Sequence, residues 1–495
     1  MMEHLPVVIV AISLLSSFTI LISGIFSRRA GYYISLATII IQLIFSAILL
    51  DYILKNGTIR YWLGGWRPPW GIEYVVDELG VYMLSIVLVF SLLATIYARR
   101  VVEKEIEESK WPYFYTLWQL MISGLVGVSV TGDLFNLFVF LEIASLAGYA
   151  LIAMAGRKAF VASYNYLILG TVGISFYLLG TAFLYAETGT LNMLDAKILL
   201  SLVYENRVVQ ASFVFYFIGL AIKMALFPFH TWQPDAYEHS PSAVTVLIST
   251  AMAKINAYAP IRVVFSVFAV SFLERFVQVW TLIAWIAALA VILGSVFAIM
   301  QRSLKRMLAY SSISHVGYIV LGMTFLHTKW GLSAAVVHLL NHSIMKATLF
   351  MVACGFIYKF GFKEIDDLAG IGRKMPFSAA AFTIAAISMI GIPPTVGFVT
   401  KLYIILASIE TGQIAYIFVM VASSLLSLVY FWRVIETMYM KGDHHHEQER
   451  EELPAEMLLP AIFLSFLTIA FGLFWLSGAG MPMLDTIAKT LGVVP

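Results

Sequence analysis

Long apolar runs separated by short polar stretches dominate this chain. A run of about 20 apolar residues can cross the ~30 Å hydrocarbon core of a bilayer as a helix. The pattern predicts fourteen such helices, at residues 5–26, 31–53, 78–98, 113–131, 134–156, 160–186, 209–228, 242–268, 276–300, 304–326, 331–358, 376–408, 412–438 and 456–478. We therefore predict an all-α integral membrane protein.

Composition supports this class and excludes others. Of the 495 residues, 61% are hydrophobic and 12% are charged, whereas soluble domains contain about 25% charged residues. A formal net charge of +2 gives no basic footprint for nucleic acid. The single cysteine, Cys354, excludes a disulfide framework and an iron–sulfur site within the chain. With no Gly-rich phosphate loop either, we expect no cofactor in this chain.

Basic residues are unevenly divided between the two sets of alternating loops. One set holds only Lys55, Arg60, Arg67, Lys197, Arg207, Arg275, Lys329 and Lys489. The opposite set holds more than twice as many, among them Arg28, Arg29, Arg99 and Arg100. Because cytoplasmic loops carry the excess of Lys and Arg, we predict that both termini lie outside the cytoplasm of a prokaryotic cell. Residues 1–26 lack a basic start and a small-residue cleavage site, so we expect no cleavable signal peptide.

Prolines interrupt two of the expected helices. Pro228 follows Lys223 in one, and Pro393 and Pro394 precede Lys401 in the other. Proline removes an amide donor and clashes with the preceding turn, so both helices should break there. The two broken helices are five spans apart, which predicts two inverted five-helix repeats. The expected organisation is residues 1–112 with three helices, 113–270 and 271–440 as the repeats, and 441–495 with a cytoplasmic loop and the last helix.

Three polar stretches connect these helices. Residues 56–78 are rich in Trp, Gly and Pro and predict a short hairpin on the outer face. Residues 362–375 predict a polar cytoplasmic connector. The loop 436–452 contains Asp443 and three histidines, His444, His445 and His446. We interpret that loop as a solvated polar segment, with a metal site as the alternative.

Five ionisable side chains lie roughly midway along the expected membrane helices: Glu142, Lys223, Lys254, Lys346 and Lys401. A charge at the bilayer centre costs roughly 2.5–3.5 kcal/mol even on the most lenient scale, and such residues usually mark ion or proton paths. Glu142 is expected to pair with Lys223, because a nearby ammonium group would keep a buried carboxylate ionised. The alternative is that these charges only hold helices together, which would make the chain a structural scaffold.

Histidines extend this set of titratable groups. His338, His342 and Lys346 follow one another at i, i+4 and i+8, spanning about 12 Å along one helix face. His315 is expected to link Lys254 to this face, and Lys401 to be the last group before an exit. Histidine titrates near neutral pH and can pass protons in steps. Two histidines four residues apart could instead bind zinc, but the stretch reads HLLNH and lacks a metalloprotease glutamate.

Five segments resemble a known family. They are DLFNLFVFLEIASLAGYA from Asp133, KMALFPFHTWQPDAYEHSPSAVTVLISTAMAKINAY from Lys223, QRSLKRMLAYSSISHVGY from Gln301, HLLNHSIMKATLF from His338 and GIPPTVGFVTKLYI from Gly391. They are similar to the antiporter-like subunits of respiratory complex I and to the D subunit of Mrp-type sodium/proton antiporters. That family includes the related subunit of archaeal membrane-bound hydrogenase-type complexes. Only a short stretch follows residue 478, which is unlike the longest complex I members.

The resemblance implies a function. It implies fourteen helices in two inverted repeats, and proton translocation through the residues that match Glu142, Lys223, Lys254 and Lys401. His338, His342 and Lys346 match the central hydrophilic axis of some members. We expect an ion-translocating protein without a catalytic centre of its own, bound to other membrane subunits and powered by a redox arm or by sodium exchange. The host complex and the passage of sodium through this chain stay open.

Overall fold

The computed structural model describes residues 2–442 and 450–493. The long helices are α1 (Leu5–Ser23), α2 (Ala30–Asn56), α3 (Glu78–Glu105), α4 (Trp111–Val130), α5 (Leu134–Ala153), α6 (Arg157–Thr188), α8 (Arg207–Lys223), α13 (Val277–Ile299), α14 (Leu304–Thr324), α15 (Lys329–Phe360), α19 (Ala415–Tyr439) and α20 (Ala455–Leu476). The shorter ones are α7 (Met193–Leu200), α9 (Trp232–His239), α10 (Ser242–Leu247), α11 (Ala253–Val263), α12 (Ala269–Arg275), α16 (Ile371–Lys374), α17 (Pro376–Ile390), α18 (Val396–Glu410) and α21 (Met481–Thr490). Single turns are η1 (Met2–His4), η2 (Leu63–Gly65), η3 (Glu108–Lys110) and η6 (Asp366–Leu368), and η4 (Ile248–Met252) and η5 (Val264–Phe268) are π-helical.

The helices confirm the all-α membrane class. In the described ranges, 11 helical segments are long and apolar enough to cross a membrane. The predicted number of fourteen is not confirmed, because three expected spans fall outside these segments. One of them is α8, which stops at Lys223. A second is divided between α17 and α18, each 15 residues long. The third, α14, carries polar residues such as Ser312 and His315 along its length.

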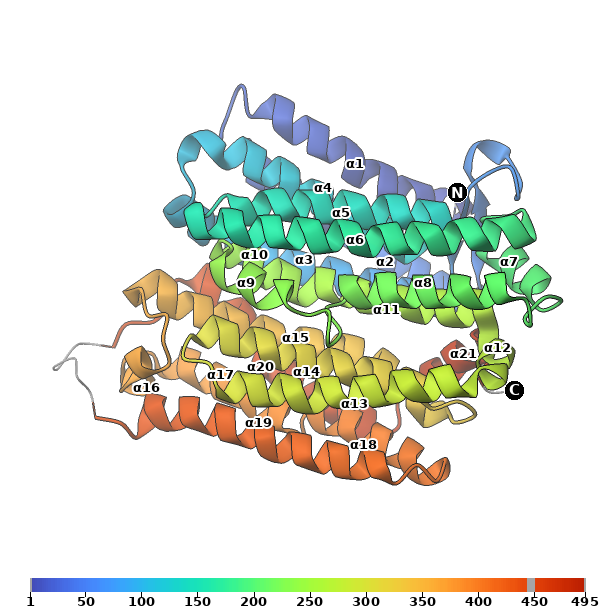
Figure 1. Ribbon diagram of the computed structural model, residues 1–495. Helices are drawn as coiled ribbons and strands as arrows, with labels where there is room; N and C mark the ends of the chain where they lie inside the picture. The colour runs from blue at the N-terminus through green and yellow to red at the C-terminus, as the bar shows by residue number, and fades with distance from the viewer. Residues whose placement is uncertain (1, 443–449, 494–495) are drawn as a thin grey trace.

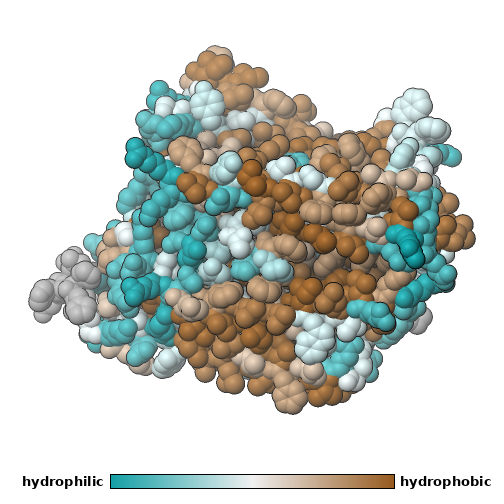
Figure 2. Space-filling model, in the orientation of Figure 1, coloured by the Kyte–Doolittle hydropathy of each residue, from teal (hydrophilic) through white to brown (hydrophobic). Residues whose placement is uncertain are grey.

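The long helices run side by side in one bundle (Figure 1). Helices α1, α4, α5 and α6 lie towards one side, α13, α18 and α19 towards the other, and α8, α11 and α15 between them. The N- and C-termini lie at the same end of the bundle. Apolar residues form a broad band over the middle of the visible face, and polar residues gather at the two ends of the helices (Figure 2). This distribution suits a bundle that crosses a bilayer.

Two helices are interrupted where the prolines predict it. After α8 ends at Lys223, Ala225 adopts a left-handed φ of 57°, and helix resumes only at α9. After α17, Gly391 has a φ of 91°, a conformation that glycine adopts without strain. Helix resumes at α18, beyond Pro394. The predicted breaks at Pro228 and at Pro393 and Pro394 are therefore confirmed.

The Trp-rich segment is a hairpin, as predicted. Strand β1 (Ile59–Trp62) pairs antiparallel with β2 (Glu73–Val76), and Trp62 lies opposite Glu73. The Glu73 carboxylate accepts hydrogen bonds from Arg60 and, at 2.7 Å, from Asn192 before α7. The bond from Asn192 fixes the hairpin to the end of the bundle that holds the N-terminus (Figure 1). Between the strands, Trp70 is 87% exposed.

Short helices occupy several stretches that the sequence prediction treated as connecting segments, namely α7, α9, α12, α16 and α21. The last of them, α21, buries Leu484, Ile487 and Ala488. Its 10 residues are too few to give the 20-residue apolar run on which the prediction relied. Residues 443–446 of the loop 436–452, which we interpret as a solvated polar segment with a metal site as the alternative, lie outside the described residues. The inverted repeat and the domain boundaries stay predictions.

Candidate functional site

Lys223 ends α8 with its ammonium group against Glu142 of α5. Lys223 Nζ lies 2.5 Å from Glu142 Oε1 and 2.9 Å from Ser145 Oγ. Ser145 follows Glu142 by three residues, so both side chains project from one face of α5. The lysine side chain is 1% exposed and that of Glu142 is 19% exposed. The structure thus brings together the two residues that we expected to pair.

Side chains from neighbouring segments cover the interrupted end of α8. The last carbonyl groups of a helix lack partners inside the helix. Here Trp232 Nε1 donates to the carbonyl of Ile222, and Asn256 Nδ2 donates to the carbonyl of Lys223, both at 3.0 Å. The break therefore exposes no unsatisfied backbone at these two positions, which is a requirement at membrane depth.

Lys254 lies just after a π-helical turn. Its Nζ donates to the carbonyl of Ser249 at 2.6 Å, inside η4. A π-turn leaves carbonyl groups without their usual helical partner, and such turns are frequent at functional sites. The neighbouring carbonyl of Thr250 accepts from Ser343 Oγ of α15 at 3.0 Å. The turn therefore supplies acceptors both to Lys254 and to the helix that carries the histidines.

Three histidines form a stacked cluster between α14 and α15. The ring centroids of His315, His338 and His342 lie 5.0 to 5.2 Å apart, and the rings are nearly parallel. His315 Nδ1 lies 3.1 Å from His338 Nε2, and His338 Nδ1 lies 3.0 Å from Thr400 Oγ1 of α18. The nearly parallel rings and the 3.1 Å contact between ring nitrogens of His315 and His338 join the histidines in a row. This geometry suits stepwise proton exchange.

Lys346 and Lys401 have only neutral hydrogen-bond partners among the described residues. Lys346 Nζ contacts the carbonyl of Leu308 at 2.7 Å and Ser311 Oγ at 2.5 Å. Lys401 Nζ contacts the carbonyl of Ile390 at 2.7 Å and Ser424 Oγ at 2.8 Å. Ile390 is the last residue of α17, so Lys401 places its ammonium group at the negative end of that half-helix.

The buried titratable side chains divide into two separate sets. Lys254, Lys346 and Lys401 lie close enough to His315 and His338 to act on their charge, so these five side chains make one electrostatic cluster. The pair of Glu142 and Lys223 stands apart. Within the described ranges, no hydrogen bond joins Lys223 to Lys254. A small cavity beside Lys223 is also lined by Gln233, Tyr237, Asn256 and residues of η4.

Sequence reasoning missed a buried ion pair at the end of the bundle that holds the termini. Arg262 donates to both oxygens of Asp77, with Nη1–Oδ2 at 2.5 Å and Nη2–Oδ1 at 2.7 Å, and its Nε donates to Tyr258. Burial alone would raise the pKa of Asp77, but the charge and hydrogen bonds of Arg262 lower it below its usual value. The available signal was an arginine inside the expected span 242–268.

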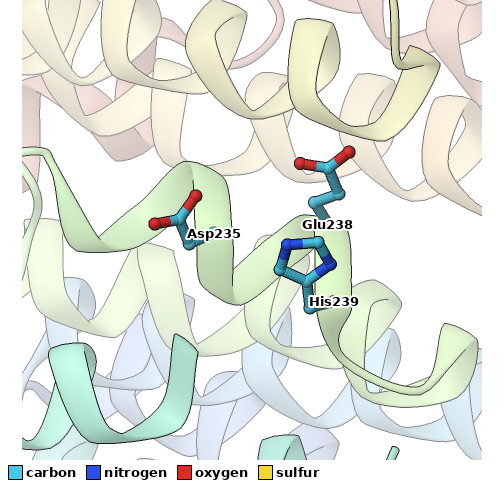
Figure 3. Close-up of side chains that lie close together, drawn as sticks. All are labelled: Asp235, Glu238 and His239. Atoms are coloured by element: carbon cyan, nitrogen blue, oxygen red, sulfur yellow. The ribbon is translucent and has the colours of Figure 1, made fainter. Parts of the chain in front are cut away.

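A carboxylate cluster on α9 could be mistaken for a metal site. Asp235, Glu238 and His239 project from neighbouring turns of α9 (Figure 3), and their ligand atoms lie within 4.8 Å of one another. Arg306 of α14 already binds both carboxylates, at 2.5 Å from Asp235 Oδ1 and 3.0 Å from Glu238 Oε2. We interpret the cluster as an ion-pair contact that fixes α9 to α14.

The fold and the site together define a class. The chain is a multi-pass membrane protein in which two interrupted helices place lysines next to a buried row of titratable groups. A model of the family described as NADH:quinone oxidoreductase/Mrp antiporter, TM, matches residues 131–427. The chain therefore belongs to this family, and it is an antiporter-like membrane protein.

Relatives and solved structures agree with this assignment. The chain is 41% identical to the N subunit of NADH-quinone oxidoreductase from Desulforudis audaxviator, over 96% of each protein. It is 30% identical to the D subunit of the Na(+)/H(+) antiporter from Bacillus subtilis, over 92% of this chain and 91% of that protein. Its fold matches a chain of the archaeal membrane-bound sulfane sulfur reductase with a TM-score of 0.88 and 31% identity, over 99% and 97% of the two chains. It also matches a chain of the Mrp complex of Dietzia sp. DQ12-45-1b, with a TM-score of 0.87 and 26% identity over 98% and 96%.

Proposed function

We propose that this chain moves protons across the cell membrane of a prokaryote, as one subunit of a larger membrane complex. The observation that carries the proposal is the buried pair of Lys223 and Glu142, 2.5 Å apart at the end of an interrupted helix. The path we propose runs through Glu142, Lys223, Lys254, His315, His338, His342, Lys346 and Lys401.

The contrast between the lysines supports proton transfer. Lys223 has a carboxylate partner, whereas the contacts of Lys254 and Lys401 are carbonyl and hydroxyl oxygens. A buried ammonium group without a counter-ion is costly to keep charged, so a proton arriving there is readily passed on. Opening the ion pair with Glu142 would leave the Lys223 ammonium group without a counter-ion, as in Lys254 and Lys401. Opening and closing of the pair can thus control when Lys223 releases its proton.

The relatives suggest the kind of membrane complex in which this chain works. One solved relative is described as part of an archaeal respiratory membrane complex, and another belongs to an Mrp complex. We propose that this chain also works beside other membrane subunits, powered by a peripheral redox arm or by exchange against sodium. The distribution of basic loop residues favours an orientation with both termini outside the cytoplasm. Reporter fusions at each terminus of the full chain test this orientation.

The proposal is tested in the parent complex reconstituted into proteoliposomes. Proton uptake by wild type is compared with Lys223→Ala and Glu142→Gln, and assembly is checked in parallel. Lys55→Ala is the matched control, because Lys55 pairs with Asp51 on the surface with 68% of its side chain exposed. Lost uptake in fully assembled Lys223→Ala complexes supports the proposal. Normal uptake per assembled complex overturns it, and reduced assembly with normal uptake favours a structural scaffold.

A further inference from the structure

The Thr400 hydroxyl departs from the usual behaviour of buried threonines in this protein. Helical threonine hydroxyls commonly donate to the carbonyl four residues earlier. Thr348 and Thr468 do so, at 3.0 Å from the carbonyl groups of Ile344 and Leu464. The hydrogen-bond partners of Thr400 Oγ1 lie instead on α15, and one of them is His338 Nδ1 at 3.0 Å.

Asn341 explains the difference. The carbonyl four residues before Thr400 is that of Val396, and it accepts a hydrogen bond from Asn341 Nδ2 at 2.9 Å. The same Nδ2 lies 3.2 Å from Thr400 Oγ1. Because Nδ2 donates to a carbonyl, the orientation of the amide is fixed, and Asn341 can only donate to Thr400. Among the described residues, Thr400 Oγ1 has no hydrogen-bond partner besides Asn341 Nδ2 and His338 Nδ1, so His338 Nδ1 is the available acceptor for the hydroxyl hydrogen of Thr400.

This arrangement sets the position of the proton on His338. A neutral imidazole carries one N–H and one acceptor nitrogen. With Nδ1 accepting from Thr400, the proton of His338 sits on Nε2 and is donated to His315 Nδ1, 3.1 Å away. His315 in turn carries its proton on Nε2, a buried atom with no hydrogen-bond partner among the described residues. All donors in the row Asn341, Thr400, His338 and His315 therefore point the same way.

We propose that the Thr400 hydroxyl holds His338 in its Nε2–H form and is itself the group that passes protons between α18 and the histidine cluster. The inference rests on the proposed function. When a proton enters on the Thr400 oxygen, the Thr400 O–H bond breaks and His338 Nδ1–H forms. His338 Nε2–H then breaks, His315 Nδ1–H forms, and the proton on His315 Nε2 leaves to the next group of the path. One proton enters and one leaves.

The test uses hydroxyl variants in the assembled complex. Thr400→Val keeps the shape and removes the hydroxyl, Thr400→Ser restores it, and Thr468→Val is the matched control on α20. Proton uptake should fall on the order of a hundredfold in Thr400→Val, the lower end of the roughly 10²–10⁴-fold range that one positioned proton-transfer group contributes. Uptake should stay near wild type in Thr400→Ser and Thr468→Val. Where Thr400→Val does not assemble, Thr400→Ala carries the same expectation.

A second measurement separates tautomer control from packing. Nitrogen-15 NMR of histidine-labelled complex, with the His338 signal identified by its loss in His338→Gln, should show Nε2–H in wild type and a mixture with Nδ1–H in Thr400→Val. An unchanged tautomer, or failure of Thr400→Ser to restore uptake, overturns the role of Thr400. Normal uptake in Thr400→Val beside lost uptake in Lys223→Ala also overturns it and leaves the proposed function standing. Normal uptake in Lys223→Ala removes the proposed function itself.

Discussion

Replacing Glu142 with glutamine isolates the charge of the central ion pair. Glutamine keeps the size of the side chain and an oxygen that can accept from Lys223, so the hydrogen bond between the two side chains is retained. What changes is the negative charge 2.5 Å from the ammonium group. We expect Glu142→Gln to assemble normally and to transfer protons far more slowly than wild type.

The size of the effect follows from the geometry. Two unit charges 2.5 Å apart attract by about 6–7 kcal/mol at an effective dielectric constant near 20. Since 19% of the Glu142 side chain is exposed, solvent screens part of this energy, and about half of it, ~3 kcal/mol, is a reasonable net value. That is on the order of a hundredfold change in the proton equilibrium of Lys223. It is of the same order as the roughly 2.3 kcal/mol that one charge gains on crossing the whole membrane at 100 mV.

The assay is proton flux into proteoliposomes as a function of imposed membrane potential. Glu142→Gln should lower the flux on the order of a hundredfold at equal potential and equal assembly. Glu205→Gln is the control, because Glu205 pairs with Arg275 at the surface with 86% of its side chain exposed. A flux in Glu142→Gln within about twofold of wild type, less than 0.5 kcal/mol, would refute the electrostatic reasoning.

Three further predictions concern stability, measured as thermal unfolding of the detergent-solubilised protein. Because Arg262 lowers the pKa of Asp77, the stability from this pair is present at neutral pH and lost as pH falls through the lowered pKa. The melting temperature should therefore decrease as the pH is lowered below about 4, and this decrease should be less steep in Asp77→Asn. Equal dependence of the melting temperature on pH in the two proteins would contradict this prediction. Gly472→Ala should destabilise the protein, since its Cβ would lie 1.9 Å from the carbonyl oxygen of Pro394; an unchanged melting temperature would show that α20 can shift. Arg306→Gln should lower the free energy of unfolding by about 1 kcal/mol, the range of partly exposed ion pairs. A much larger decrease would show that this contact stabilises the fold more than such a pair.

The sequence was most informative where the cause is local. A proline forbids regular helix wherever it falls inside a span, so both interruptions could be placed from Pro228 and Pro393. The pairing of Glu142 with Lys223 was also accessible, because a carboxylate in apolar surroundings needs a partner and few were available. Long apolar runs gave the membrane class for the same reason, since length and composition are properties of the chain alone.

The sequence was least informative where the partner is distant. Asp77 and Arg262 are 185 residues apart, and nothing near either residue indicates that they meet. The residues around Thr400 likewise give no indication of its hydrogen bonds, because the direction of its hydroxyl depends on how Asn341 of another helix binds a carbonyl of α18. Short amphipathic helices such as α21 were missed because a search for spanning length cannot detect them.

The two interrupted helices differ in how their free carbonyl ends are covered: neutral groups cover the end of α8, and a charged group covers the end of α17. At the end of α8, the indole of Trp232 and the amide of Asn256 cover the carbonyl groups, and neither group gains or loses charge. At the end of α17, the covering group is the ammonium of Lys401 itself. Loss of that charge would remove the cation from the negative end of the half-helix and leave the carbonyl of Ile390 without a charged partner. The cover of α17 is therefore sensitive to protonation, whereas the cover of α8 is not.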